Sequence, residues 1–298
     1  MPMKILLSAV IFLLSISFAA AQYPPVPVLP NVAHRGASAA APENTLAAFR
    51  KAAQFGADGA ECDVYKTADG VLVILHDKNT KRTTGFDGDI TKMSYAEVQK
   101  LDAGKGEKIP ALAEYLSVLK GTKTKPVIEI KQEGIVREVI DEINGSGMRK
   151  AAVIISFSAE SVKTARRLAP NIPAALLCSA DLKKTGGSAE DNAEKFFAGL
   201  TASAKSCNTN ILDINHQILS KPLAEQLNRS GIALWAWTVD DPQRMETLLD
   251  WGVVSITTNK PDVLTKVLQR RAAQKHSAQK HSAQQHSAQK RAAEAAAQ

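Results

Sequence analysis

The chain is 298 residues long, of which 45% are hydrophobic and 22% charged, and its formal net charge is +7. The hydrophobic share is ample for one large core, and the 248 residues from 22 to 269 match the size of a single α/β barrel. The charge lies in the tail, because residues 270–298 carry +5 whereas residues 22–269 carry only about +1. A nucleic-acid-binding body is therefore not expected.

The first 21 residues predict a signal peptide. Lys4 precedes a mostly apolar stretch from Ile5 to Phe18, and the alanines at 19–21 form a small-residue cleavage site. The stretch is short for a membrane span, so a retained anchor is the less favoured alternative. We expect an exported, periplasmic or secreted protein without stable membrane insertion.

Export would place the mature chain in an oxidising compartment, where disulfides persist. The chain has only three cysteines, an odd number. Cys62 is expected to point away from the neighbouring acidic side chains as a small buried hydrophobe, whereas a disulfide between Cys178 and Cys207 is left open. The chain has no CxxC motif, so the cysteines are not expected to bind a metal.

Short apolar runs rich in β-branched residues alternate with helical segments along the body of the chain. The eight predicted strands are Asn31–Arg35, Gly59–Tyr65, Pro126–Lys131, Ala152–Phe157, Ala174–Cys178, Ile211–Asn215, Ala233–Val239 and Val254–Thr258. This alternation predicts a parallel sheet with outer helices, and thus an α/β fold of the TIM-type (β/α)8 barrel class. An open doubly wound sheet is the alternative, but no glycine-rich dinucleotide loop follows the first run.

A further apolar run, Val71–His76, follows the turn signal Thr67–Gly70. A four-residue turn is too short for the crossover between parallel strands, so this run is predicted to be a small hairpin arm after the second strand. A hairpin symmetric about the turn would place Glu61 opposite His76 and Asp63 opposite Ile74. Opposed residues project from the same face.

Carboxylates and histidines stand on or just after several of these strands: His34, Glu61, Asp63, His76 and Glu129. Side chains alternate along a strand, so Glu61 and Asp63 share one face. Oxygen ligands suit a hard cation such as Ca²⁺ or Mg²⁺, and histidines can act as acid and base near neutral pH. A single carboxylate could be a buried charge paired with lysine, but burying all five groups would be costly without a shared site.

An ordered set of short motifs extends this interpretation. The pieces are His34-Arg35-Gly36-Ala37, Pro42-Glu43-Asn44-Thr45, Glu61-Cys62-Asp63, His76-Asp77, Ile109-Pro110, Ile128-Glu129-Ile130-Lys131, Ser156-Phe157 and Trp237-Thr238-Val239. In this order they resemble the glycerophosphodiester phosphodiesterase family, in its bacterial, secreted type. The resemblance covers nearly all of the mature body and leaves out the tail.

The resemblance implies a TIM-type barrel, one divalent cation, and hydrolysis of deacylated phospholipids to glycerol 3-phosphate and an alcohol. It implies these roles: Glu61, Asp63 and Glu129 as metal ligands, His34 and His76 as the acid/base pair, Arg35 and Lys131 as phosphate contacts, Glu43 as a supporting partner, and Trp237 beside the glycerol. Trp235, which shares strand parity with Trp237, is expected to pack in the core, and His216 is expected to be a loop histidine.

The chain departs from the family pattern at two places. Asp240 follows Trp-Thr-Val where asparagine is common, and Thr258-Asn259 stands where an aspartate is common. Neither position is expected to touch a metal or acid/base residue, so the departures bear on substrate detail only.

The tail repeats a pentad that contains His276, His281 and His286. A step of five residues does not align side chains on one helix face, so these histidines do not predict a metal site. Residues 270–298 are expected to be a solvated tail, disordered or a frayed helix, with weak contact to an anionic surface or loose metal capture as the alternatives.

Two other functions compete with the first. One is a related barrel phosphodiesterase acting on intact lipids, phospholipase D-like or phosphoinositide-cleaving, and the polar segment Asp77–Lys108 argues against it. The other is a non-enzymatic surface adhesin, which the retention of all three carboxylates argues against.

Overall fold

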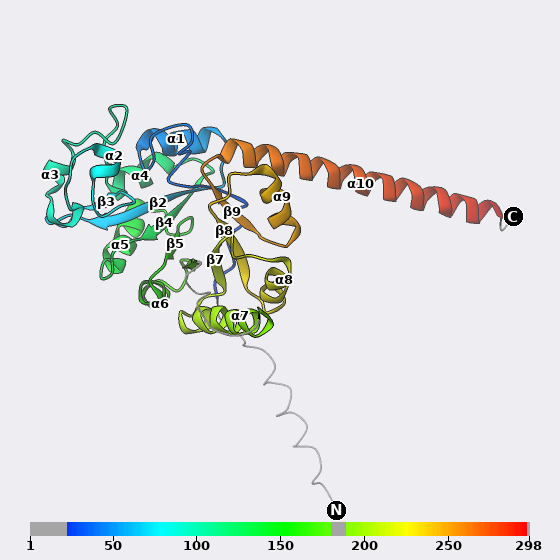
Figure 1. Cartoon of the computed structure of the whole chain (residues 1–298). Helices are drawn as coiled ribbons and strands as arrows, with labels where there is room; N and C mark the ends of the chain where they lie inside the picture. The colour runs from blue at the N-terminus through cyan, green and yellow to red at the C-terminus, as the bar shows by residue number, and fades with distance from the viewer. Residues whose placement is uncertain (1–22, 180–188, 297–298) are drawn as a thin grey trace, which may run out of the picture.

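The computed structural model describes residues 23–179 and 189–296, and the predicted signal peptide lies outside the described residues. Its centre is a closed barrel of parallel strands (Figure 1). The barrel strands are β1 (Asn31–Ala33), β2 (Gly59–Lys66), β4 (Lys125–Ile130), β5 (Val153–Ser156), β6 (Ala174–Cys178), β7 (Ile211–Asn215), β8 (Ala233–Trp237) and β9 (Ser255–Thr258). The order is β1-β9-β8-β7-β6-β5-β4-β2, and the pairing of β1 with β2 closes the ring. The prediction of a TIM-type (β/α)8 barrel is confirmed.

Each barrel strand leads to a helix on the outside of the barrel (Figure 1). These helices are α1 (Leu46–Gln54), α4 (Leu112–Leu119), α5 (Val136–Ser146), α6 (Ala159–Leu168), α7 (Ala189–Ser206), α8 (Lys221–Arg229), α9 (Pro242–Asp250) and α10 (Pro261–Ala296). The residues at the two ends of α9 explain where the helix begins and ends. Asp241 accepts a hydrogen bond from Arg244 N before the first helical residue, Pro242, and Gly252 follows the helix with φ +83°.

Alternation along the strands separates two apolar layers. Side chains directed outward pack against the helices in the larger core, which includes Cys62 and Ile128. Side chains directed inward fill the barrel, where Val32, Val127 and Trp235 are fully or almost fully buried. The expectations that Cys62 is a buried hydrophobe and that Trp235 packs in the core are confirmed. All three cysteines are buried and free, so the open question of a Cys178–Cys207 disulfide is answered in the negative.

The segment after β2 forms a subdomain of its own. It contains β3 (Leu72–Ile74), α2 (Lys81–Thr84), the short 3₁₀ helix η1 (Ile90–Lys92) and α3 (Tyr95–Val98). These elements enclose a separate small core that includes Val73, Ile90 and Ile109. β3 pairs antiparallel with β2, as the predicted hairpin arm requires.

The register of this hairpin differs from the prediction by one residue. Ile74 lies opposite Val64, and Leu75 N donates a hydrogen bond of 3.0 Å to Asp63 O. The reason is the turn, because Thr67 N bonds to Val71 O and closes a loop of three residues that ends in Gly70 with φ +90°. His76 lies beyond the end of β3, so strand parity does not determine the direction of its side chain.

Helix α10 continues through the low-complexity tail to Ala296 and projects away from the barrel (Figure 1). The structure thus agrees with the helical alternative that the sequence left open for residues 270–298, and not with disorder. Alanine, glutamine, lysine and arginine favour helix, and no glycine or proline follows Pro261. No helix among the described residues is long and apolar enough to cross a membrane.

We predict that the body ends after Arg271 and not at Gln269. Arg271 bonds to Glu246 and Asp250 of α9 at 2.7 Å each, and Arg270 pairs with Glu246. A chain that ends at Gln274 should keep the melting temperature of the full chain. A chain that ends at Gln269 should melt lower, by about 2–4 °C for each kcal/mol of ion pairing lost. Equal melting temperatures for the two truncated chains, measured by circular dichroism, would contradict this boundary.

Candidate active site

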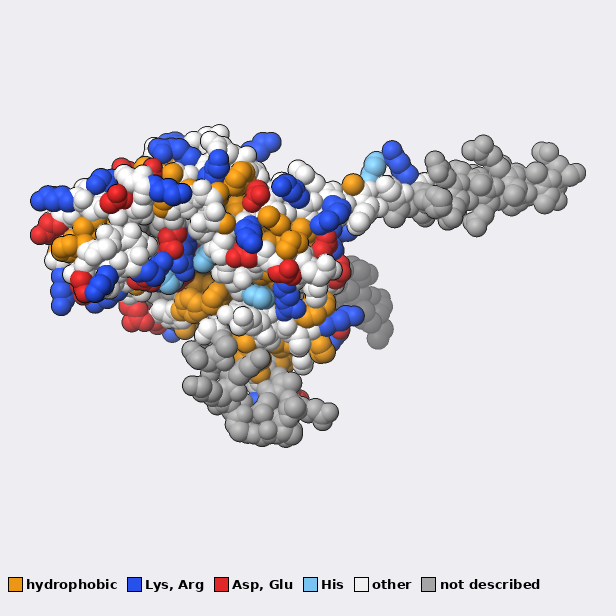
Figure 2. Space-filling view, turned by 45° about the horizontal axis from the view of Figure 1, so that its top comes forward, with side chains coloured by type: hydrophobic (Ala, Val, Ile, Leu, Met, Phe, Trp, Pro, Cys, Tyr) orange, Lys and Arg blue, Asp and Glu red, His pale blue; other side chains and the backbone are white. Residues whose placement is uncertain are grey.

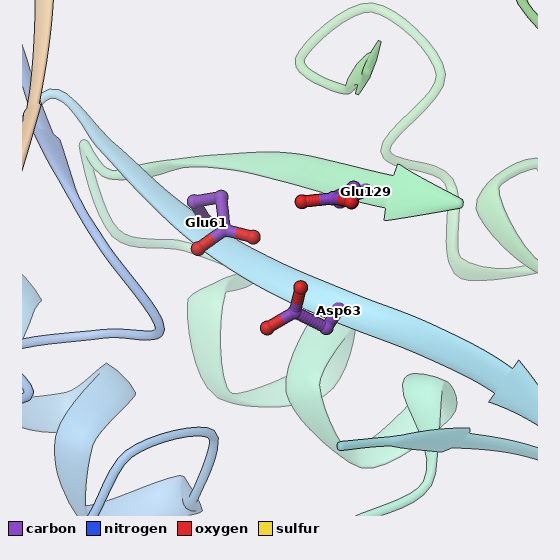
Figure 3. Close-up of side chains that lie close together, drawn as sticks. All are labelled: Glu61, Asp63 and Glu129. Atoms are coloured by element: carbon purple, nitrogen blue, oxygen red, sulfur yellow. The ribbon is translucent and has the colours of Figure 1, made fainter. Parts of the chain in front are cut away.

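Three acidic side chains converge inside the barrel near the carboxyl ends of β2 and β4 (Figure 3). Glu61 and Asp63 project from the same face of β2, and Glu129 on β4 lies in register with Asp63. One carboxylate oxygen of each lies within 4.8 Å of the others. All three side chains are buried, with exposed fractions of 2%, 1% and 8%. Strand alternation predicted the pair on β2, and the parallel register adds the third member.

The electrostatics of this cluster are unbalanced. Burial, together with the charges of Asp63 and Glu129, raises the pKa of Glu61 well above its usual value. Burial and the charge of Asp63 raise the pKa of Glu129 to about 7. Burial also pushes the pKa of Asp63 upward, but Lys131 and other cationic neighbours outweigh it and hold that pKa below its usual value. The site therefore has an excess of negative charge when all three carboxylates are ionised.

A tight turn after β1 connects the cluster to the backbone. Arg35 and Gly36 have φ values of +53° and +76°, and this left-handed pair directs Arg35 N to Glu61 Oε2 at 2.7 Å. A Cβ atom on Gly36 would lie 2.6 Å from the carbonyl carbon of Ala48, so only glycine fits there. Asn44, also left-handed with φ +57°, donates from Nδ2 to Asp63 Oδ2 at 2.8 Å.

The predicted phosphate contacts lie beside the carboxylates. Lys131 Nζ is 2.8 Å from Glu129 Oε1 and 3.3 Å from Asp63 Oδ1, while Arg35 Nε is 3.6 Å from Asp63 Oδ2. Glu43 accepts from Arg35 Nη1 at 2.9 Å, which is the supporting contact expected of it. Burial raises the pKa of Glu43, but Arg82 and Arg35 outweigh it and keep that pKa below its usual value.

The two histidines have different partners. His34 Nδ1 lies 2.8 Å from the amide oxygen of Asn259, whereas His76 Nδ1 lies 2.6 Å from the carboxylate of Asp77. Burial, with the adjacent charge of Arg35, lowers the pKa of His34 to about 4. His76 is more open, with 32% of its side chain exposed. Both side chains line the same cavity as Glu61 and Glu129, as the sequence predicts.

This cavity measures about 190 Å³ and is lined by both polar and apolar side chains. The apolar ones include Leu177, Phe157 and Trp237, and the last two rings meet edge to face at 5.4 Å between centroids. Trp237 is thus at the pocket position expected of it. Asp213 also lines the cavity, and its Oδ1 has no partner among the residues that the structure describes. In the face seen in Figure 2, histidine side chains lie beside an apolar patch, and charged side chains lie near it.

The structure corrects one expectation about the site. Asn259 was expected to lie away from acid/base residues, yet it hydrogen-bonds to His34, and Asp240 in turn holds Asn259. The prediction was wrong because His34, Asp240 and Asn259 all lie beyond the ends of their strands, where strand parity does not determine the direction of a side chain. His216 lies outside the cavity lining and contacts Arg244, which agrees with a loop residue.

Three further residues contact the predicted site residues, and the sequence analysis assigned no role to them. Asn44 binds Asp63, Asp77 binds His76, and Arg82 bonds to both Asp77 and Glu43. Asn44 and Asp77 belong to the motifs that resemble the family, so the sequence already marked both as candidate site residues. Arg82 lies on α2 of the subdomain, and no local pattern reveals a contact that spans 39 residues of sequence.

The comparisons with known proteins identify the family of this chain. The model of the glycerophosphoryl diester phosphodiesterase family matches residues 34–263. A glycerophosphodiester phosphodiesterase from Caldanaerobacter subterraneus subsp. tengcongensis is 32% identical over 251 residues, which are 80% of this chain and 97% of the relative. The chain belongs to the glycerophosphoryl diester phosphodiesterase family.

Other family members support the same assignment. A glycerophosphodiester phosphodiesterase from Bacillus subtilis is 31% identical and covers 80% of this chain and 85% of its own length. A phosphodiesterase from Oleispira antarctica, solved with the product sn-glycerol-3-phosphate, has a TM-score of 0.69 at 28% identity and covers 81% of this chain and 97% of that one. This family member is accordingly a phosphoric diester hydrolase with the family's barrel fold.

The turn at Gly36 gives a stability prediction. Gly36→Ala and Gly70→Ala both place a Cβ on a left-handed residue, at a cost of about 1–2 kcal/mol. Only Gly36→Ala also forces a clash with Ala48, which adds about 1–3 kcal/mol, because nothing lies within 4 Å at Gly70. Urea unfolding should show a clearly larger loss for Gly36→Ala. Equal losses would mean that the turn is not packed as described.

Proposed function

We propose that this chain hydrolyses glycerophosphodiesters to glycerol 3-phosphate and an alcohol, with one divalent cation, Ca²⁺ or Mg²⁺, and two-histidine acid/base catalysis. The observation that carries the proposal is the convergence of three buried carboxylates, within 4.8 Å of one another, in the wall of a cavity that two histidines also line. A phosphodiester repels nucleophiles and has a poor leaving group, so its hydrolysis needs both charge neutralisation and proton transfer.

The donor set fits a hard cation. No hydrogen-bond donor among the described residues serves Glu61 Oε1, whereas Asp63 Oδ1 has the ammonium of Lys131 at 3.3 Å. A buried carboxylate oxygen without a partner, as at Glu61, carries a large free-energy cost unless a cation binds it. Glu61, Asp63 and Glu129 would hold the ion. All donors are oxygen, which favours Ca²⁺ or Mg²⁺. A bound cation would supply positive charge to a phosphate oxygen.

The differing partners of the histidines support different roles. His34, whose pKa is lowered to about 4, is neutral at physiological pH, so its ring has a free lone pair that can accept a proton. His76 faces the Asp77 carboxylate at 2.6 Å, and its protonated form gains a charge-assisted hydrogen bond there. We therefore assign the removal of a proton from the attacking oxygen to His34 and the protonation of the leaving oxygen to His76.

The cationic and aromatic side chains near the carboxylates fit a substrate that joins a phosphate to a glycerol unit. Lys131 and Arg35 provide positive charge beside the carboxylates, and the rings of Phe157 and Trp237 offer an apolar wall for the carbon skeleton of a glycerol unit. The solved family member from Oleispira antarctica contains sn-glycerol-3-phosphate, the product expected here. Its 28% identity over 81% of this chain supports the same substrate class.

A small soluble substrate is favoured over an intact lipid. Helix α2 and the residues on either side of it carry several ion pairs. These include Lys78 with Asp89 and Lys81 with Asp87. Inserting these charged groups into a lipid surface would be unfavourable. The phospholipase D-like and phosphoinositide-cleaving alternatives therefore rank second, and the assay should include intact phospholipid vesicles.

Export completes the proposal. The apolar stretch and the cleavage site at residues 1–21 support a secreted or periplasmic enzyme. The tail of α10 beyond Arg271 contributes no described residue to the cavity lining, so its removal should leave hydrolysis unchanged. Its positive charge supports weak, salt-sensitive contact with anionic surfaces.

The direct test is to incubate the purified chain with glycerophosphocholine, glycerophosphoethanolamine and bis-glycerophosphate and to follow glycerol 3-phosphate release. We expect release that stops with chelator and returns with Ca²⁺ or Mg²⁺. Release of phosphate products from intact phospholipid alone, or activity untouched by chelator, would contradict the proposal.

The raised pKa values predict a pH dependence of cation binding. Glu129, with a pKa of about 7, and Glu61, whose pKa is also raised, hold protons that must leave before a cation binds. Affinity for Ca²⁺ or Mg²⁺ should therefore fall by at least about fivefold between pH 7 and pH 6, because the carboxylate of Glu129 is increasingly protonated there. Isothermal titration calorimetry measures this affinity at each pH directly.

Glu129→Gln should lose most of the affinity, while Glu225→Gln on the exposed face of α8 serves as the control. Affinity that is constant from pH 8 to pH 6 would count against the assignment.

The histidines give a second prediction. His34→Ala and His76→Ala should each lower turnover by about 10² to 10⁴-fold, because a proton transfer is lost while the cation ligands stay in place. His216→Ala is the matched control, since His216 also follows a barrel strand but lies outside the cavity lining. Turnover is measured with glycerophosphocholine, and cation binding by calorimetry. Full turnover in either cavity variant would refute its role.

A further inference from the structure

We propose that Asp240 and Asn259 form a positioning pair that fixes the ring of His34 with its proton on Nδ1 and its unprotonated Nε2 toward the cavity. The inference rests on the proposed role of His34 as base and names the residues that prepare it for that role. None of the three side chains belongs to the carboxylate cluster, and all three follow neighbouring strands, β8, β9 and β1.

The first contact joins the ring to the amide. His34 Nδ1 lies 2.8 Å from Asn259 Oδ1, and the hydroxyl of Ser38 donates to the same oxygen at 2.8 Å. The backbone fixes the approach, because His34 N donates to Thr258 O at 2.8 Å. His34 is therefore held by two hydrogen bonds, one from its backbone N and one at Nδ1 of its ring.

The second contact decides which way the amide faces. Asp240 Oδ2 accepts from Asn259 Nδ2 at 2.6 Å, and Asp240 Oδ1 accepts from the backbone N of Asn259 at 2.8 Å and from Thr258 Oγ1 at 3.0 Å. A carboxylate can only accept hydrogen bonds, so the NH₂ group of Asn259 must face Asp240. Its oxygen is left to face His34.

The tautomer of His34 follows from this orientation. An amide oxygen accepts hydrogen bonds, so Nδ1 of the neutral ring must be the nitrogen that carries the proton. Nε2 then holds the free lone pair. Because Nδ1 is directed at Asn259, Nε2 lies on the other side of the ring, and the side chain lines the cavity with Glu61 and Glu129. A lone pair there is what a general base needs.

The two departures from the family pattern are these same two residues. The resemblance to the family, with asparagine common at position 240 and an aspartate common at Thr258-Asn259, implies that the carboxylate and the amide have exchanged places. Either arrangement presents an oxygen to His34 Nδ1 and a complementary partner behind it. Changing only one residue breaks the pair: Asp240→Asn leaves two amides with no fixed orientation, and Asn259→Asp opposes two carboxylates.

The test is a reciprocal exchange in the full chain. The variants are Asp240→Asn, Asn259→Asp and the double variant Asp240→Asn/Asn259→Asp, with Asp262→Asn on the exposed start of α10 as a control that removes the same charge. With glycerophosphocholine and saturating cation, each single change should lower kcat by about 10- to 100-fold with a smaller change in KM. The double variant should recover most of the lost kcat, and the control should keep it.

A second readout is independent of activity. In protein labelled with ¹⁵N-histidine, the His34 signals, assigned by their loss in His34→Ala, should show a protonated Nδ1 and an unprotonated Nε2. Asp240→Asn, which is isosteric and adds no like charge, should shift the signals toward a mixture of tautomers, and the double variant should restore them.

The outcomes separate this inference from the proposed function. Wild-type kcat and an unchanged Nδ1–H tautomer in Asp240→Asn would overturn the positioning pair, as would a double variant no better than either single one. If the wild-type chain releases no glycerol 3-phosphate, the proposed function fails. The ¹⁵N signals of Asp240→Asn would still decide whether the pair sets the tautomer of His34.

Discussion

Mutual repulsion among three buried carboxylates is the constraint on which the rest of this site depends. Glu61, Asp63 and Glu129 are held together by the parallel register of β2 and β4, which the barrel closure enforces. Lys131 and Arg35 offset part of the repulsion, yet the pKa values of Glu61 and Glu129 stay raised. A cavity adjoins the cluster, and buried carboxylates whose repulsion is only partly offset are the kind of site that we propose binds a hard cation.

The two histidines show how a barrel can give similar side chains different chemistry. His34 follows a barrel strand and faces a neutral amide held by a second loop, whereas His76 comes from the subdomain after β2 and faces a carboxylate. The subdomain also supplies Arg82, whose bonds to Asp77 and Glu43 connect the surroundings of His76 with those of Arg35. The inserted segment is thus part of the site, although it packs around its own small core.

Much of this could be predicted from the sequence. Period-two alternation and β-branched runs identify all eight barrel strands, and parity along β2 places Glu61 and Asp63 on one face. Two features could not be derived. The hairpin register depends on the hydrogen bond between Thr67 and Val71, and the contact of Asn259 with His34 depends on the directions of side chains in two loops that lie 225 residues apart in the sequence. Local sequence patterns thus identify the helices and strands, whereas the partner of a given side chain depends on contacts between distant parts of the chain.

The central claim is that one hard cation binds between β2 and β4. Anomalous diffraction from crystals soaked in Mn²⁺, which shares the preference of Mg²⁺ for oxygen ligands, locates such an ion without reference to activity. The account predicts a single strong peak in contact with oxygens of Glu61, Asp63 and Glu129, which is absent in crystals of Glu61→Gln. A peak elsewhere in the barrel, or none at this cluster at saturating Mn²⁺, would contradict it.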